Sequence, residues 1–305
     1  MQPPGPENWA RWLYWKIRPR IGSLRQHSPR PLRMPTPYQG SFPAAPPSFS
    51  IVVPSFNQGR FLRSTLDSVL VQQYPNLELI AQDGGSTDES AAILKEYSRH
   101  LKHWESQPDE GQTHAINLGF RHATGEILSY LNSDDLLLPG CLAYVGAFFA
   151  SNPAVDVVYG HRVIVDERGM EIGRWILPAH EDKILGWIDY VPQETLFWRR
   201  SIWEKVGASV DERFRFAMDW DLLVRFSEKG ARFARLPRFL GAFRVHDAQK
   251  TTSEMEDRGK REMQQLRERM HGRAVSNSEV RLRVLPYLLK SGVLDRLYRL
   301  GILRY

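Results

Sequence analysis

The stretch that decides the fold is SIVVPSFN (50–57), an apolar run that ends in a polar turn. Such a run predicts a buried strand. An amphipathic stretch follows at 61–72, and a second apolar run at 77–82 ends in DGGSTD (83–88). Strand, helix and strand at this spacing predict a βαβ unit of a parallel sheet. Open α/β sheets bind ligands at the carboxyl ends of their strands.

The second of these strands ends in a turn that suits a ligand. Gly84 and Gly85 allow the backbone to approach a bound molecule closely, and Asp83 can accept hydrogen bonds from a base or a ribose. An ordinary Asp-Gly-Gly-Ser turn is the alternative interpretation.

A third polar cluster ends another predicted strand. The run GEILSYLNSDD (125–135) places the adjacent carboxylates of Asp134 and Asp135 after an apolar segment. Two neighbouring acids repel each other unless a divalent cation and its anionic ligand lie beyond them, and Mg²⁺ takes one or two carboxylates together with substrate phosphates. The pattern therefore favours a nucleotide diphosphate as ligand. Capping of a helix that starts near Pro139 is the alternative role for either acid.

The set of motifs resembles glycosyltransferase family 2, a large inverting group with the GT-A nucleotide-sugar-binding fold. The matching segments lie in family order within residues 49–250 and are SIVVPSFN (50–57), DGGSTD (83–88), DEG (109–111), AINLG (115–119) and NSDD (132–135). The resemblance implies an α/β fold with a mostly parallel central sheet flanked by helices. Its nucleotide half would be 49–138 and its acceptor half 139–250, followed by a helical C-terminal extension at 251–305.

The resemblance also implies a donor site. Asp83 would contact the nucleobase, and Asp134 the ribose or the donor sugar. The implied nucleotide-binding residues are Pro54, Phe56, Asn57, Asp83, Asp109, Asn117 and Asp134. For Asp109, capping of a helix that would begin at Gly111 is the competing role.

A divalent metal, Mn²⁺ or Mg²⁺, is implied by the same resemblance. Asp135 would be a ligand, whereas Ser133 stands where the family often has a further Asp. The run FRVH (243–246) resembles the family's closing motif, in which a His can complete the metal shell and a basic residue can face the diphosphate. This implies roles for His246 and Arg244. Imidazole suits Mn²⁺ better than Mg²⁺. A lone His is otherwise usually a surface or core residue.

The catalytic base is implied by FAMDWDLLVR (216–225), which resembles the family's acidic motif at the start of a helix. Asp219 would take the proton of the acceptor hydroxyl as its oxygen attacks the anomeric carbon. Asp221 lies about 200° further round a helix, so both acids cannot face one acceptor. A helix-start acid that complements the helix dipole is the alternative for Asp219. Further acceptor or diphosphate contacts are expected from Gln193, Glu194, Trp220 and Arg244, although Gln193 and Glu194 also fit polar positions at a strand edge.

Charge is uneven along the chain. Residues 1–48 carry seven Lys or Arg against one Glu, and residues 254–305 carry twelve against seven acids. The whole chain has a net charge of +6, so an acidic central region of net charge −5 lies between two basic segments. No nucleic-acid recognition motif or zinc pattern accompanies the basic residues, and a nucleic-acid partner is therefore not expected.

The N-terminal segment combines its cations with Trp9, Trp12 and Trp15, and a Pro-rich stretch at 29–47 reads as an extended linker. Tryptophan and basic residues favour an anionic membrane surface. A disordered tail with an aromatic patch docked on the protein is the alternative. The segment 254–305 reads as helical with a break near Pro286, packed on the domain or lying on an interface.

These observations predict a metal-dependent inverting transferase. It would move a sugar from a nucleotide sugar, with a UDP-sugar first in order, to a saccharide or lipid-linked acceptor in polysaccharide or glycolipid assembly of the cell envelope. The single Cys141 and the lack of an apolar run of 18 residues favour a cytoplasmic protein, peripheral on the inner face of the membrane if the N-terminal segment binds lipid. The Gln-x-x-Arg-Trp motif of processive synthases is absent, so one sugar per encounter is expected. A sugar nucleotidyltransferase and a non-catalytic scaffold are the rivals.

Overall fold

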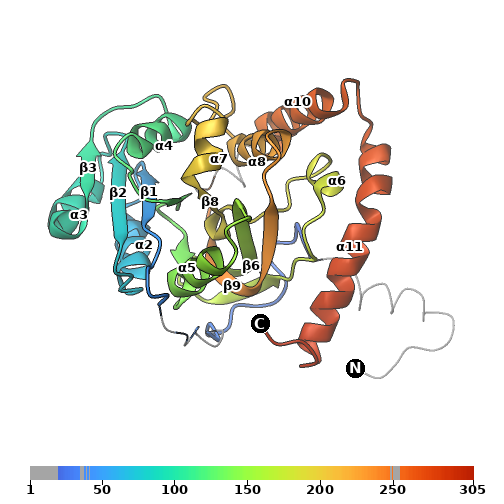
Figure 1. Ribbon diagram of the computed structural model, residues 1–305, viewed down its shortest axis with the longest axis horizontal. Coiled ribbons are helices and arrows are strands. Elements are labelled where there is room, and N and C mark those ends of the chain that lie inside the picture. Colours follow the sequence, from blue (N-terminus) through green and yellow to red (C-terminus); the bar gives the residue numbers. More distant parts are fainter. Residues whose placement is uncertain (1–19, 35–37, 39, 41, 248, 250–254) are drawn as a thin grey trace.

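The computed structural model describes residues 20–34, 38, 40, 42–247, 249 and 255–305. Its centre is a nine-stranded sheet in the order β3-β2-β1-β4-β8-β6-β9-β5, with β7 paired to β6. Figure 1 shows this sheet with helices around it and the long helix α11 along one edge of the molecule. The aromatic residues of the N-terminal segment, Trp9, Trp12 and Trp15, lie outside the described residues.

The first half of the sheet is parallel throughout. Its strands are β1 (Phe49–Ser55), β2 (Leu77–Asp83), β3 (His103–Ser106) and β4 (Ile127–Tyr130). Its helices are α2 (Gly59–Leu70), α3 (Ser90–Tyr97) and α4 (Gln112–Phe120), with the short η2 (Ser98–His100) after α3. The predicted βαβ unit is β1-α2-β2, and because its strands are parallel, their carboxyl ends meet at one edge of the sheet.

The second half of the sheet is mixed. Its strands are β5 (Leu136–Leu137), β6 (Val157–Asp166), β7 (Glu171–Trp175), β8 (Phe197–Arg199) and β9 (Phe233–Val245). Only β6 and β9 pair in parallel, whereas β8 runs antiparallel to both β4 and β6. The helices of this half are α5 (Cys141–Ser151), α6 (Asp182–Leu185), η3 (Gln193–Thr195), α7 (Arg200–Lys205) and α8 (Met218–Glu228).

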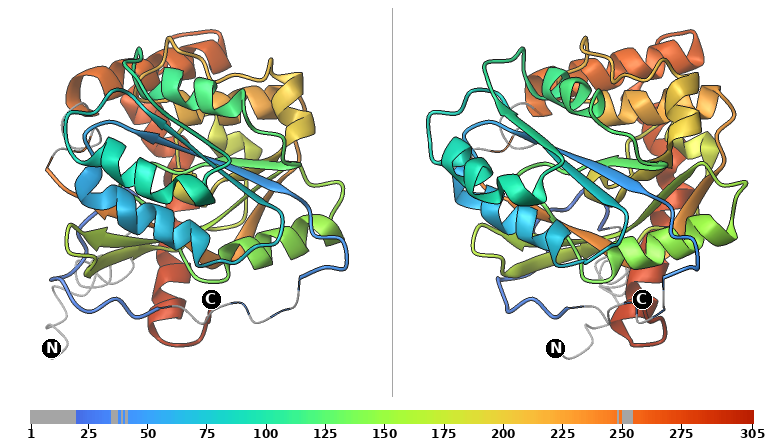
Figure 2. Two further views of the ribbon diagram at one scale, coloured as in Figure 1. Left: turned by 90° about the vertical axis from the view of Figure 1, so that its left-hand side faces the viewer. Right: turned by 60° about the vertical axis from the view of Figure 1, so that its left-hand side comes forward.

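The sheet is buried on both faces. Along β1, Val52 packs with α4 and α8, whereas its neighbours Ile51 and Val53 pack with α2, α3 and α5. Successive residues of a strand point to opposite faces, which explains why the middle of β1, residues 51–53, is apolar at consecutive positions. Figure 2 shows α2, α3 and α5 in front of the sheet in its left view. The fold is therefore a three-layer α/β arrangement.

The C-terminal extension is helical, as predicted, but its break is not at Pro286. It comprises a π-helical turn (Met255–Gly259), α10 (Lys260–His271) and α11 (Asn277–Arg299), and α11 contains Pro286. The chain turns instead at Gly272, which has a φ of 62°. Pro286 lies on the exposed side of α11, where water can bond the carbonyl that lacks an amide partner, so the helix continues through it.

Part of the predicted N-terminal linker is bound to the sheet. Arg30 forms an isolated antiparallel bridge with Glu171 of β7, and its guanidinium pairs with the Glu171 carboxylate at 2.5 Å. Gln26 donates its backbone N–H to Ile172 O at 2.8 Å, and the indole of Trp175 donates to Ser23 O at 3.0 Å. These bonds satisfy the edge of β7. Ser23 and Gln26 precede the predicted linker at 29–47, so the linker interpretation is wrong only at its start, where Arg30 pairs with β7.

Candidate active site

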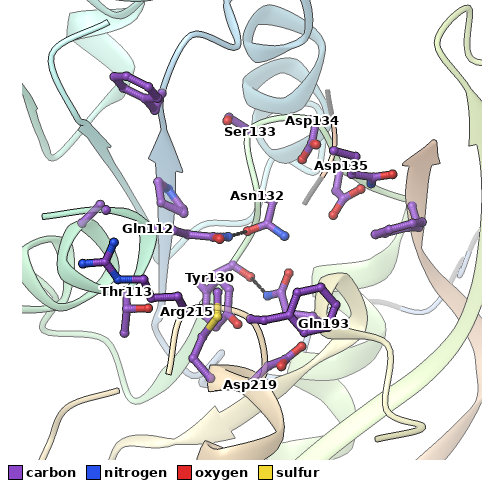
Figure 3. A pocket seen from close by; sticks show the side chains of 18 of the residues that line it. Gln112, Thr113, Tyr130, Asn132, Ser133, Asp134, Asp135, Gln193, Arg215 and Asp219 are labelled. Carbon is purple, nitrogen blue, oxygen red and sulfur yellow. Dashed lines mark hydrogen bonds between the residues drawn. The ribbon is translucent and has the colours of Figure 1, made fainter. Parts of the chain in front are cut away.

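A cavity of about 910 Å³ lies at the carboxyl ends of the parallel strands. Residues that follow β1, β2 and β4 form one side of it, and residues from β6, η3 and α8 form the other. Figure 3 shows Asp134 and Asp135 at one side and Asp219 at another, with Asn132 between them. The cavity therefore holds four of the carboxylates that the sequence singles out, because Asp109 lines it as well.

Asp134 and Asp135 follow β4 in a tight turn and lead into β5. The Asp135 carboxylate is buried and accepts the backbone N–H of Arg244 at 2.9 Å. Burial and the nearby carboxylates of Asp134 and Glu194 raise the pKa of Asp135 well above its usual range. The helix that follows, α5, has Gly140 at its N-cap and no capping side chain. The capping alternative for these two acids is therefore wrong.

His246 and Asp134 lie together. The imidazole Nε2 is 2.9 Å from Asp134 Oδ2, and the ring packs on Phe61. Among the described residues no group of three or more His, Cys, Asp or Glu side chains is gathered as a complete metal site. However, two carboxylates and an imidazole suit a cation whose other ligands are phosphate oxygens. Asp135 is buried next to the carboxylate of Asp134, and a cation between them would offset their repulsion.

Arg244 is close to both acids but does not line the cavity. Its Nε donates to the carbonyl oxygen of Asp134 at 2.8 Å, and its guanidinium also lies 3.4 Å from the carbonyl oxygens of Asp166 and Glu167. Its side chain therefore fixes the turn that carries Asp134 and Asp135. In this arrangement it does not face the cavity, where the expected diphosphate would be.

Asp219 lies in the first turn of α8 and lines the cavity. Burial raises its pKa to about 6, although Oδ1 accepts the N–H of Trp220 at 2.8 Å and Arg162 attracts the charge. A carboxylate with a pKa near 6 is a better proton acceptor than an exposed one and is still ionised at neutral pH.

Asp189 is a cavity residue that the sequence analysis missed. It lies in the irregular segment before η3 and is exposed to the cavity, and desolvation together with the Asp219 charge raises its pKa well above the usual range. Ionisation of Asp219 therefore disfavours ionisation of Asp189. Only its position four residues before Gln193 pointed to Asp189, and an isolated acid in a loop carries no motif.

Two buried polar atoms face this acidic pair. Gln193 donates from Nε2 to the carbonyl oxygen of Tyr130 at 2.7 Å, as Figure 3 shows, and lines the cavity. Its Oε1 and the hydroxyl of Tyr130 have no hydrogen-bond partner among the described residues. Because unpartnered buried polar atoms are costly, a polar ligand in the cavity would stabilise both.

A buried ion pair supports the far wall. Arg162 of β6 binds the carboxylate of Glu194 through two hydrogen bonds, and its guanidinium lies 4.6 Å and 4.4 Å from the ring centroids of Trp175 and Phe243. Arg162, Trp175 and Phe243 line the cavity, whereas Glu194 does not. Glu194 therefore acts on the cavity through Arg162. The sequence did not predict a role for Arg162, because most residues around it on β6 are apolar and indicate only a buried strand.

The expected donor pocket is partly formed. Pro54, Phe56, Gly84 and Asp109 line the cavity, and Phe56 is exposed at its rim. A Cβ on Gly84 would lie 3.0 Å from Asp109 Oδ2, so the glycine permits the close approach of these two segments. Asp109 also accepts the N–H of Gly111 at 2.6 Å, just before α4 begins at Gln112.

Asp83 and Asn57 organise the pocket from behind. The Asp83 carboxylate is buried and accepts bonds from the N–H of Ser86 at 2.9 Å and from the hydroxyls of Ser86 and Ser106. Asn57, at a φ of 52°, accepts the N–H of Thr87 at 2.9 Å. Neither residue lines the cavity. Contact of Asp83 with a base stays a prediction.

Three other residues of the sequence analysis point away from the cavity. Asn117 bonds Val210 through both its amide atoms, and the indole of Trp220 is wholly buried and donates to Leu185 O at 2.7 Å. Asp221 is buried and pairs with two arginines of α8 and α10. These contacts hold α4 and α8 in place. The opposite orientations of Asp219 and Asp221 are as expected for residues two apart on a helix.

The C-terminal extension completes the cavity. Met255, Arg258 and Met263 line it. Glu262 of α10 accepts the backbone N–H groups of Phe216 and Ala217 at 2.8 and 2.9 Å, at the start of α8. This carboxylate satisfies amide groups that the helix itself cannot bond, and it fixes the turn that precedes Asp219.

The comparisons with known proteins agree with this geometry. Residues 50–203 match the model of glycosyl transferase family 2, and the chain belongs to this family. A PGL/p-HBAD biosynthesis glycosyltransferase of Mycobacterium bovis (strain BCG / Pasteur 1173P2) is 33% identical over 185 residues, which cover 59% of this chain and 70% of the relative.

Solved structures show the same GT-A glycosyltransferase fold. Residues 1–349 of S. aureus TarS in complex with UDP-GlcNAc give a TM-score of 0.61 at 17% identity, covering 83% of this chain and 73% of that one. The mannosyltransferase PcManGT from Pyrobaculum calidifontis, in complex with GDP-Man and Mn²⁺, gives 0.58 at 18% identity, covering 96% and 83%. The chain spans 43% of the longer TarS structure.

Proposed function

We propose that this glycosyltransferase inverts the anomeric centre of a nucleotide-diphosphate hexose while transferring the sugar to an acceptor hydroxyl. One observation carries the proposal: Asp219 and the turn with Asp134 and Asp135 line the same cavity. The pKa of Asp219 is raised to about 6 there. An inverting transfer needs a base on one side of the reacting carbon and stabilisation of the leaving diphosphate on the other.

Asp219 is the proposed base. It takes the proton of the acceptor hydroxyl as that oxygen attacks. A second charge on the neighbouring Asp189 is unfavourable, because desolvation and the Asp219 charge raise the pKa of Asp189. A protonated Asp189 donates a hydrogen bond to the acceptor or donor sugar. The free Gln193 Oε1 and Tyr130 hydroxyl supply further bonds to sugar hydroxyls.

The leaving nucleotide is proposed to lie against the ends of β1, β2 and β4. A divalent cation, Mn²⁺ or Mg²⁺, bound by Asp135 together with Asp134 and His246, would offset the diphosphate charge. Pro54, Phe56 and Asp109 flank the base and ribose, with Asp83 behind them. UDP is the first choice of nucleotide. The named UDP-GlcNAc and GDP-Man complexes of the structural neighbours support a nucleotide-sugar donor.

The proposed acceptor is a saccharide or lipid-linked molecule of glycolipid or polysaccharide assembly. The name of the mycobacterial relative, which refers to PGL/p-HBAD biosynthesis, supports an acceptor of this class. No helix among the described residues has the length and apolar character needed to cross a membrane. We propose that the enzyme acts in the cytoplasm at the inner face of the membrane.

A panel of nucleotide sugars tests the proposal. Each is added with and without Mn²⁺, and thermal unfolding and donor hydrolysis are recorded. A specific ligand at a hundred times its Kd should stabilise the fold by about 2.7 kcal/mol. We expect one nucleotide class to stabilise the protein only with metal. Stabilisation by none of them, or equal stabilisation without metal, would contradict the proposed donor site.

A further inference from the structure

The outer face of α11 carries an apolar stripe. Ten large apolar side chains are exposed among the described residues, and six of them lie in the last 24 residues of the chain. These six are Leu282, Leu285, Leu289, Val293, Leu300 and Ile302. The first five recur at intervals of three, four, four and seven residues, so they form one line along the helix.

The opposite face of α11 already packs on the protein. Val280, Val284, Tyr287, Ser291 and Asp295 are its buried residues, and they follow the same helical spacing. Packing on the domain, one of the two alternatives from the sequence, therefore explains this inner face only. Figure 1 shows α11 along the edge of the molecule, and a second apolar line on its outer side is not needed for the fold.

Cations predominate along the outer stripe. Residues 279–305 hold six Lys or Arg and two acids: Asp295 is buried and pairs with Arg299 and Arg20, and Glu279 pairs with Arg273. Arg281 and Arg283 are exposed beside Leu282. An apolar line flanked by cations is the pattern of a helix that lies in a lipid interface, where each cation near anionic lipid adds to the attraction.

The N-terminal sequence adds further cations. Residues 1–19 contain Arg11, Lys16 and Arg18 against Glu7, and Arg20 binds the buried Asp295 of α11 at 3.4 Å. The basic flanks of the stripe would oppose each other if two copies of the chain packed through it in a symmetric pair. An anionic surface complements both segments.

We propose that the outer face of α11 binds the surface of an anionic lipid bilayer. The helix lies parallel to the membrane, its leucines enter the headgroup region, and its arginines contact lipid phosphates. The proposal does not depend on the chemistry in the cavity, because none of the six side chains lines it.

Sedimentation with vesicles of equimolar phosphatidylglycerol and phosphatidylcholine tests this with the full chain. The variant Leu289→Glu/Val293→Glu should bind at least about tenfold more weakly than the unchanged protein. The matched control is Val71→Glu at the end of α2, an exposed apolar position that should leave binding unchanged. Binding of the unchanged protein should also weaken at 1 M salt, where the Debye length is about 3 Å.

A milder variant guards against misfolding. Arg281→Gln/Arg283→Gln keeps the helix and should lower binding to the anionic vesicles but not the weaker binding to pure phosphatidylcholine. Equal vesicle binding by Leu289→Glu/Val293→Glu and the unchanged protein would overturn the proposal. So would a dimer, seen by sedimentation velocity without lipid, that the same two substitutions dissociate, because the stripe would then be covered by a second copy. Donor hydrolysis without vesicles should be the same in all folded variants.

Discussion

Replacement of Asp219 by Asn should make the protein more stable while it removes transfer. The Asp219 carboxyl has an ordinary pKa of 3.8 and a pKa of about 6 in the fold. A raised pKa means that the folded state favours the protonated form, so the associated stability is present at low pH and is lost as pH rises through 6. Asn cannot ionise and keeps the hydrogen bond from the Trp220 N–H, so it avoids this loss.

The size of the effect follows from the two pKa values. At pH 8 the ionised carboxylate costs about 3 kcal/mol of unfolding free energy, and at pH 4.5 it costs about 1 kcal/mol. Urea unfolding at both pH values measures the difference between Asp219→Asn and the unchanged protein. Transfer should fall by about 10² or more at either pH, because the base is gone. In the unchanged protein kcat/KM should fall below about pH 6.

Asp221→Asn is the matched control. Its carboxylate is buried between Arg225 and Arg269, so its loss should destabilise the protein at both pH values, by about 2 kcal/mol or more. At each pH the gain is the unfolding free energy of Asp219→Asn minus that of the unchanged protein. The reasoning on Asp219 would be refuted if this gain were no larger at pH 8 than at pH 4.5, or if the variant kept full transfer. A large transfer loss confined to Asp221→Asn would exchange the two roles.

The remaining predictions concern the neighbours of this base. Asp189→Asn mimics the protonated acid and should keep the transfer rate within about tenfold at pH 7, whereas Asp189→Ala should lower that rate further. Equal losses of transfer rate in the two variants would exclude the hydrogen-bonding role. Asp135→Ala should remove the metal dependence of nucleotide binding in a calorimetric titration, and unchanged affinity and metal dependence would exclude it as a ligand. Glu262→Ala removes the acceptor of three backbone amides before α8, those of Arg215, Phe216 and Ala217, and should cost about 1–2 kcal/mol in urea unfolding and lower kcat. Glu262→Gln should recover part of both.

The sequence predicted the parallel half of the fold well because the signals there are local. Apolar runs ending in Asn57, Asp83 and Asp135 define three strands and their ligand edge. The mixed half was harder, since β8 has three residues and its pairing with β4 depends on contacts distant in sequence. Pro286 misled the helix prediction because its effect depends on whether water can reach the freed carbonyl, and exposure is a tertiary property.

The site was predictable where a motif carries its chemistry. Asp134, Asp135 and Asp219 reach one cavity as expected, but Trp220 and Asn117, which belong to the same set of motifs, hold helices together instead. Asp189 acquires its raised pKa only from desolvation and from the Asp219 charge. No pattern of neighbouring residues encodes such a pairing between segments 30 residues apart.

The most direct test of the central claim is the anomeric configuration of the sugar that the enzyme first releases. With diamagnetic Mg²⁺ and the nucleotide sugar that binds best in the panel, donor hydrolysis at high enzyme concentration is followed by time-resolved proton NMR before the free sugar equilibrates. Water then takes the place of the acceptor hydroxyl beside Asp219. The account predicts that an α-linked donor first yields the β-anomer and that Asp219→Asn abolishes this signal. First release of the α-anomer would contradict the inverting mechanism.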